Sequence, residues 1–378
     1  MTKRQKSKSE KKKLSRGQML FCVMSVVAML LTFKLPEVAI EAMSEGMTLC
    51  IQTVIPALFP FMVFSELFIS SGAAEYAGRY LGAPLCALFG ISRDGSAALM
   101  LGLLCGFPIG SKSAISLYER GRISRGELEH ILSFCNTPSS AFLISAVGVS
   151  LFGSRQIGAM LYISHVISAC CAGLIGRIFF SKKKRKREYY LGATGCNEGK
   201  TGVVSSLTNA VSRSAQGMLL ICAFVIFFSA VVGYLRYFAS RTDMPCEIVA
   251  LIFGFFEMTG GISTAAQLTY GLAIPVSALI SGWSGLSVAF QFAGICGEHD
   301  ISLKPYFLSK LFVALLNAVV FSALCGVFVE SIRAGNRDSV SSLLILTGSP
   351  MSLISLTVFF CGCAPLIFKR KPSKTELS

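Results

Sequence analysis

A broken motif interrupts the hydrophobic stretch at residues 95–118, where the sequence reads Gly106-Phe-Pro-Ile-Gly-Ser-Lys112. The stretch is long enough to cross a bilayer, but glycine and proline disrupt helices. Unsatisfied backbone groups are costly in hydrocarbon, so such a break survives at membrane depth only where protein or a water-filled cavity surrounds it. The lysine that follows is also costly there and typically marks a pathway or a ligand site. The alternative is a kinked helix whose lysine extends to the nearer membrane surface.

The composition is that of an integral membrane protein. Of the 378 residues, 53% are hydrophobic and only 15% are charged, and the mean hydropathy is +0.64. These values exclude a water-soluble domain of ordinary composition. Residues 20–33 resemble the apolar part of a signal peptide, but no small-residue cleavage site follows them. We therefore expect an uncleaved first membrane helix.

The net charge of +15 is concentrated at three places. Eight Lys and Arg residues lie in 1–16, seven in 177–187 and four after residue 367. Each cluster flanks a hydrophobic segment, as the positive-inside rule requires of cytoplasmic ends, and anionic lipid headgroups are the expected partners. No helix-turn-helix or aromatic-interleaved pattern accompanies the charge, so we expect no nucleic acid partner. Both termini and the 181–202 loop should then face the cytoplasm.

Cysteine and histidine give no sign of a metal centre. The fourteen cysteines are scattered singly through apolar runs, and the three histidines stand far apart. We therefore interpret the cysteines as small buried hydrophobes and expect no metal and no cofactor. The sequence also lacks a nucleophile elbow, a His-Glu-x-x-His motif and a phosphate loop. It is expected not to be an enzyme.

Eleven hydrophobic segments and one polar linker, residues 189–202, organise the chain. The segments are 18–33, 47–71, 79–91, 96–118, 131–153, 156–180, 214–238, 247–268, 271–296, 306–330 and 349–368. The expected organisation is a basic cytoplasmic tail (1–17), a first membrane helix and connector (18–46), a first repeat (47–180), a basic cytoplasmic linker (181–213), a second repeat (214–330), and a last membrane helix with a basic tail (331–378).

The two repeats share one order of elements: a long helix, a Gly-broken segment, a segment interrupted midway, and a long helix. The Gly-broken segments are interrupted at 106–112 and 257–261, and the others at 136–139 and 281–285. Matching interruptions in two halves of a membrane protein are typical of secondary transporters.

We assign the second pair of interruptions to re-entrant hairpins, at 131–153 and 271–296, and place the short segment 79–91 at the membrane interface. Each repeat then crosses three times, an odd number, so the repeats have opposite orientation. The predicted fold is an all-α polytopic membrane protein of about eight crossings, with two inverted-topology repeats, broken helices and re-entrant hairpins.

The interruptions also supply the candidate substrate site, near the bilayer centre. Lys112 and the free N–H groups of restarted half-helices would hold an anion. Glu257 would carry a coupling proton or cation, or instead form an ion pair with Lys112. The predicted substrate-binding residues are Gly106, Pro108, Gly110, Ser111, Lys112, Asn136, Thr137, Ser139, Glu257, Thr259, Gly260, Ser281, Gly282, Ser284 and Gly285.

Three further features have structural interpretations. Ser124 followed by Glu127 is a capping box, which predicts a short amphipathic helix whose charges form a solvated face. Gln291 is as compatible with a satisfied helix–helix contact as with a site residue. Asn317 lies on a closing helix and is interpreted as structural.

The motifs resemble a known family. Gly106-Phe-Pro-Ile-Gly-Ser-Lys112, Gly121-Arg-Ile-Ser124 and Leu132-Ser-Phe-Cys-Asn-Thr-Pro-Ser139 resemble the signature of the YlbJ-like sporulation integral membrane proteins. Phe256-Glu-Met-Thr-Gly260 and Gly282-Trp-Ser-Gly-Leu-Ser287 look like counterparts in the second half. The resemblance covers roughly residues 47–330.

The resemblance implies two repeats of the nucleoside-recognition, or Gate, type, akin to concentrative nucleoside transporters. It implies a multi-pass protein of the bacterial cell membrane, in the outer forespore membrane during sporulation, that passes the small organic anion dipicolinic acid into the forespore. Two alternatives stay open: a non-transporting scaffold of a sporulation complex, and a nucleoside-type carrier. The coupling ion and an oligomeric state are also open.

Overall fold

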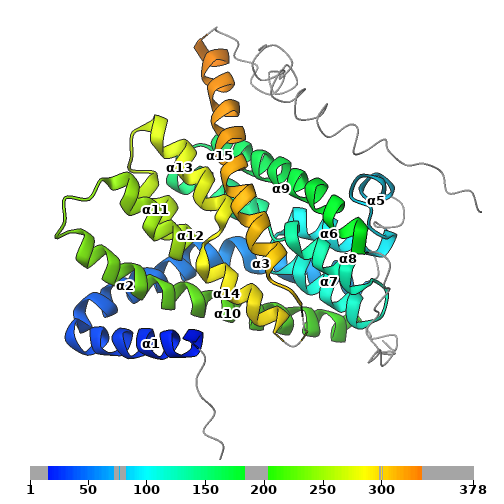
Figure 1. Cartoon of the computed structure of the whole chain (residues 1–378), viewed down its shortest axis with the longest axis horizontal. Helices are drawn as coiled ribbons and strands as arrows, with labels where there is room; N and C mark the ends of the chain where they lie inside the picture. Colours follow the sequence, from blue (N-terminus) through cyan, green and yellow to red (C-terminus); the bar gives the residue numbers. More distant parts are fainter. Residues whose placement is uncertain are drawn as a thin grey trace, which may run out of the picture.

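A computed structural model describes residues 16–71, 76, 82–183, 203–297, 299 and 301–333, and within them every regular element is a helix (Figure 1). The elements are α1 (Arg16–Lys34), α2 (Pro36–Leu49), the π-helix η1 (Cys50–Val54), α3 (Ile55–Ser70), α5 (Ala83–Phe89), α6 (Arg93–Cys105), α7 (Ile109–Glu119), α8 (Arg125–Phe134), the π-helix η2 (Phe142–Leu151), α9 (Arg155–Lys183), α10 (Val203–Ala239), α11 (Cys246–Phe256), α12 (Met258–Ala265), α13 (Tyr270–Trp283), α14 (Gly285–Cys296) and α15 (Lys304–Arg333). The predicted all-α membrane fold is confirmed.

Four helices of the described part are long and apolar enough to cross a membrane: 155–179, 204–239, 271–296 and 304–326. Two bent helix pairs, α2–η1 with α3 (53°) and α5 with α6 (95°), raise this number to six if each pair is one span. The last predicted helix, 349–368, and the basic ends of the chain lie outside the described residues. Helix α10 begins at Val203, within the residues predicted as the linker, 181–213.

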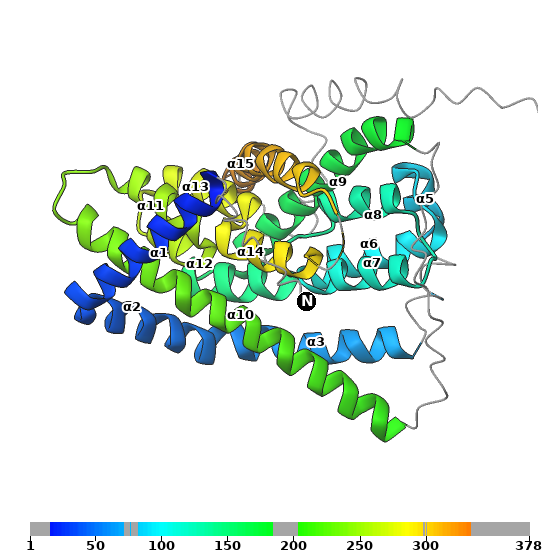
Figure 2. The ribbon, with the colours of Figure 1, turned by 60° about the horizontal axis from the view of Figure 1, so that its bottom comes forward.

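One side of the molecule is a pair of crossing elements, α2–η1–α3 and α10 (Figure 2). Small residues allow their backbones to approach: a Cβ at Gly46 would lie 2.5 Å from Ser229 Oγ, and Gly233 faces Ala42 in the same way. Close packing of small side chains is the usual basis of helix association in membranes, since lipid provides no hydrophobic driving force between helices.

The other side contains α9, α15 and two helical hairpins, α6–α7 and α11–α12. Gly102 packs on Gly110 across the first turn, and Gly254 packs on Gly261 across the second, so closely that no Cβ fits between them. The longest limb, α6, has 13 residues and rises about 20 Å at 1.5 Å per residue. Because the hydrocarbon core is about 30 Å thick, no single limb can cross it, so we interpret both as re-entrant hairpins, and the α5–α6 pair is then not a separate span.

The predicted assignment of hairpins to segments was therefore wrong. The segments interrupted at 106–112 and 257–261 form the hairpins, and the segments predicted to be hairpins are broken helices. Segments 131–153 and 271–296 are broken helices, α8–η2 and α13–α14, whose two limbs do not pack against each other extensively. In Figure 1, α14 runs on beyond α13 instead of folding back beside it, and 271–296 is long enough to span as one unit. The glycine pairs that hold limbs together occur in the other two segments, which explains the exchange.

The N-cap at Ser124 is confirmed, because Ser124 Oγ accepts a hydrogen bond from the Glu127 amide at 3.3 Å and α8 begins at the next residue, but the Glu127 carboxylate accepts from the Ser92 amide at 2.6 Å and does not complete the capping box. The predicted solvated face of α8 was wrong for Glu129. That carboxylate is buried, lies 3.4 Å from Arg125 Nε, and accepts a hydrogen bond from the Ser302 amide at 3.3 Å. It fastens α8 to the segment that leads into α15.

Candidate functional site

All four interruptions meet at one internal cavity of about 80 Å³. Its polar lining residues are Asn136, Thr137, Ser139, Glu257, Thr259, Ser284, Ser287 and Gln291. Its apolar lining residues are Val54, Leu58, Phe107, Pro138, Phe142, Ile221, Val225, Met258 and Val288. The polar groups come from the hairpins and broken helices, whereas η1, α3 and α10 supply an apolar wall.

The cavity lies where four helices begin. Phe107 precedes α7, Ser139 precedes η2, Glu257 is the N-cap of α12 and Ser284 is the N-cap of α14. A helix N-terminus presents unpaired N–H groups and a partial positive charge. Glu257 accepts from two amides of α12 and Ser139 Oγ accepts from the Phe142 amide of η2, whereas no side chain caps α14, and no lysine or arginine lines the cavity.

Glu257 is the acidic residue of the site and caps α12. It is only 6% exposed, and its two carboxylate oxygens accept hydrogen bonds from the Thr259 amide at 2.9 Å and the Gly260 amide at 2.6 Å. Its charge is therefore partly offset by the N-terminus of its own helix. The predicted ion pair between Glu257 and Lys112 does not form in the described structure.

The first hairpin is fastened to the break in α8–η2. The Phe107 amide donates to Thr137 O at 2.8 Å, and Thr137 Oγ1 donates to Gly102 O at 2.9 Å. Ser111 Oγ donates to the side-chain oxygen of Asn136. These bonds satisfy backbone groups that the hairpin turn and the helix break leave free, as membrane depth demands.

Lys310 of α15 connects the two broken helices. Its ammonium donates to the backbone oxygen of Asn136 at 2.6 Å and to Ser284 Oγ at 2.8 Å. Ser284 is the one non-glycine residue with positive φ, 70°, in the described chain. Sequence reasoning missed Lys310. A lysine inside the apolar segment 306–330 was the available signal, but its position near the start of the segment fits a membrane-surface lysine equally well.

Six of the predicted site residues line the cavity: Asn136, Thr137, Ser139, Glu257, Thr259 and Ser284. Others support it without lining it, including Ser111 and Gly106, which packs against Ser139. The predicted residues Pro108, Gly110, Gly260, Ser281, Gly282 and Gly285 are likewise not lining residues. Lys112 is also off the cavity wall, and its ammonium lies beside Gly217 of α10.

Ser287 and Gln291 extend the polar wall along α14. Gln291 Nε2 donates to Ser287 Oγ at 3.3 Å, and both side chains are buried at the cavity. Gln291 therefore has the position of a site residue, whereas the sequence alone left a structural contact equally open. One face of α14 thus offers an amide and a hydroxyl group to a ligand.

Asn317 of α15 holds the framework behind the site. It is fully buried, accepts from Ser164 Oγ at 2.7 Å, and donates to Ala278 O at 2.8 Å and to Ser281 Oγ at 3.1 Å. It thereby joins α9, α13 and α15, in agreement with the structural role that the sequence suggested.

We expect Asn317→Leu to destabilise the protein by about 1–3 kcal/mol, because it leaves buried polar partners unsatisfied. The decrease should appear as a lower midpoint of thermal unfolding in detergent. Asn209→Leu, at an exposed position of α10, is the matched control and should leave the midpoint unchanged. Equal midpoints for Asn317→Leu and the wild type would refute this role.

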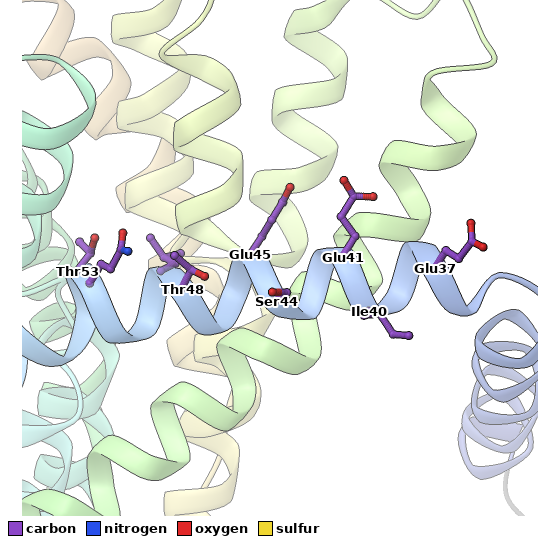
Figure 3. A pocket seen from close by; sticks show the side chains of 9 residues that line it. Glu37, Ile40, Glu41, Ser44, Glu45, Thr48 and Thr53 are labelled. Carbon is purple, nitrogen blue, oxygen red and sulfur yellow. The ribbon is translucent and has the colours of Figure 1, made fainter.

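A wider depression follows one face of α2 and η1, from Glu37 to Thr53 (Figure 3). Glu41 and Glu45 project from the same side of the helix, and Glu45 Oε2 lies 2.9 Å from Arg236 Nη1. All lining residues belong to this one segment. It therefore has no opposing wall that could enclose a substrate, unlike the internal cavity.

The fold and the cavity define a helical, multi-pass integral membrane protein whose paired re-entrant hairpins and broken helices surround a buried polar site. No protein-family model matches the sequence. The chain is 29% identical over 366 residues to the sporulation integral membrane protein YlbJ of Bacillus subtilis, and the match covers 86% of this chain and 89% of that protein. This similarity confirms the relation to the YlbJ-like proteins that the motifs predicted.

A solved structure is also similar in the path of the chain. It is the structure of CNTnw in an inward-facing substrate-bound state, with a TM-score of 0.47 and 13% sequence identity, and the match covers 82% of this chain and 85% of that one.

Proposed function

We propose that this protein transports a small organic anion across the membrane through the cavity between the two hairpins and the two broken helices. The observation that supports this best is the convergence of four helix N-termini on a cavity that holds one carboxylate, itself bonded to two amides. Oriented N–H groups bind anions without the cost of burying a mobile cation.

The surroundings support transport more than a scaffold role. A scaffold has no need of broken helices and re-entrant hairpins at membrane depth, since each break requires compensating hydrogen bonds. We propose that the two repeats have opposite orientations in the membrane. Each repeat has one hairpin, one broken helix and two long elements, which preserves the three crossings per repeat counted from the sequence.

Dipicolinate, in sporulating cells at the outer forespore membrane, is the substrate that we propose from the resemblance to the YlbJ-like family. It is a flat pyridine ring with two carboxylates. The N–H groups of α14, which no side chain caps, would bind a carboxylate, and the apolar wall of Val54, Leu58 and Val225 would contact the ring. A coupling proton or cation at Glu257 is part of the same proposal.

The direct test is uptake of labelled dipicolinate into vesicles that contain the purified protein. We expect saturable uptake that unlabelled dipicolinate inhibits and that uncharged nucleosides do not. Inhibition by nucleosides alone would favour the nucleoside-type carrier. Failure of every tested solute to enter would favour the scaffold.

Gln291→Leu tests whether the cavity is the substrate site. Loss of one polar contact to the ligand should weaken dipicolinate binding about tenfold or more, while the near-equal volume keeps the fold intact. Gln267→Leu, at an exposed position next to the second hairpin, is the matched control. Unchanged affinity in Gln291→Leu would place the substrate elsewhere.

A further inference from the structure

We infer that Lys310 joins the two broken helices and, in its protonated form, makes the cavity select substrates by their negative charge. This inference rests on the proposed transport of an organic anion and adds a specificity-determining residue to it. Lys310 does not itself line the cavity. It acts through Asn136 and Ser284, which do, so it is a positioning residue.

Lys310 donates two short hydrogen bonds inside the protein. Its Nζ lies 2.6 Å from Asn136 O and 2.8 Å from Ser284 Oγ. The residue is only 4% exposed, so its ammonium cannot reach bulk water as a surface lysine does. The Tyr306 ring, with its centroid 5.8 Å from Nζ, covers one side.

The charge of Lys310 has no carboxylate partner among the described residues. Every ion pair there joins other groups, and Glu257 directs both oxygens to the amides of α12. A buried, unpaired ammonium is costly, and a neutral donor such as glutamine would satisfy the same two oxygens at a lower cost. The position therefore favours a use for the positive charge itself, beyond closing two hydrogen bonds.

An anion in the cavity would provide the missing compensation. Lys310 fixes the positions of Asn136 and Ser284, which line the cavity, while Ser284 Oγ donates its own proton to Ser281 O at 3.0 Å, so the ammonium acts on an anion through its electric field. Electrostatic interactions are strong in such an interior because little water screens them. A substrate with two negative charges should therefore gain more from Lys310 than one with a single charge, and a neutral substrate should gain almost nothing.

The test is a binding series with three probes of one shape: pyridine-2,6-dicarboxylate, pyridine-2-carboxylate and pyridine-2-carboxamide. Affinities are measured on the purified full chain in lipid nanodiscs. The wild type should prefer the dianion over the neutral probe. Lys310→Gln should lose about 30-fold in affinity for the dianion and little for the neutral probe, which flattens the preference. Lys310→Arg should keep part of it.

Two controls separate charge from structure. Lys304→Gln, at an exposed position of the same helix, should keep the wild-type preference. Lys310→Ala removes the charge together with both hydrogen bonds, and it should lose the preference for the dianion at least as far as Lys310→Gln does. The thermal midpoint of each variant shows that it is folded.

Each outcome is decisive. If Lys310→Gln keeps the wild-type charge preference, Lys310 is only a structural donor and the inference is overturned. If the wild type binds the neutral probe best, the proposed anion transport fails as well. Loss of charge preference in Lys310→Gln with an intact neutral-probe affinity supports the inference.

Discussion

Replacement of Gly261 by alanine is expected to abolish transport, because the second hairpin cannot then close. A Cβ at this position would overlap the Cα and amide nitrogen of Gly254, below any normal contact distance. Both overlapping atoms belong to the backbone, so no side-chain rotation relieves the clash. Overpacking of this kind costs about 1–3 kcal/mol in soluble cores, and more where backbone must separate. The hairpin would open and displace Glu257, which stands at its turn.

The measurements are vesicle uptake and the midpoint of thermal unfolding for Gly261→Ala. Gly294→Ala is the matched control, since no atom lies within 4 Å of a Cβ built at that position of α14. That control should be unaffected, or stabilised by up to about 1 kcal/mol, because alanine favours helix over glycine. Uptake by Gly261→Ala at the wild-type rate would show that the limbs of the hairpin need not touch.

Replacement of Glu257 should have the second largest effect, and two substitutions separate its two roles. Glu257→Ala removes the N-cap of α12, which costs about 0.5–2 kcal/mol, and also removes the acid from the cavity. Glu257→Gln keeps one oxygen to accept a hydrogen bond from the Thr259 or Gly260 amide. We expect it to remain folded, to bind the anion about tenfold more tightly because a like charge is gone, and to lose proton-driven accumulation.

Exchange of labelled for unlabelled substrate, which needs no driving gradient, should persist in Glu257→Gln and distinguish binding from coupling. Glu247→Gln, at the beginning of the same hairpin and off the cavity wall, should behave as the wild type in both assays. Full proton-driven accumulation by Glu257→Gln would remove the carboxylate from the coupling mechanism.

Several site residues could be predicted because a break in an apolar segment is visible in the sequence. Asn136, Thr137 and Glu257 are polar residues at such breaks, and all three line the cavity. Lipid does not tolerate free backbone groups, so any interruption at membrane depth must be enclosed by protein, whichever way the chain turns there. Because the interruptions occur in the same order in both halves and each must be enclosed by protein, the sequence also indicated that they meet at one site.

The direction of each broken segment could not be predicted in this way. An interruption has the same sequence pattern whether the chain folds back at it or continues. Which of the two occurs depends on whether the helices on either side of the interruption pack against each other. Gly102 against Gly110 and Gly254 against Gly261 close two of the four segments into hairpins. The sequence shows these four glycines, but it does not show which of them contact each other.

By itself the sequence determined the class of this protein, its helical segments and the positions of its breaks, because hydropathy and backbone satisfaction are local properties. Only the tertiary structure decided which lysine contacts residues that line the cavity. Lys112 and Lys310 are both lysines in apolar segments, yet one lies beside Gly217 of α10 and the other binds Asn136 and Ser284. The side of a helix that faces a cavity depends on how the helix packs against its neighbours, and those neighbours are distant in the sequence.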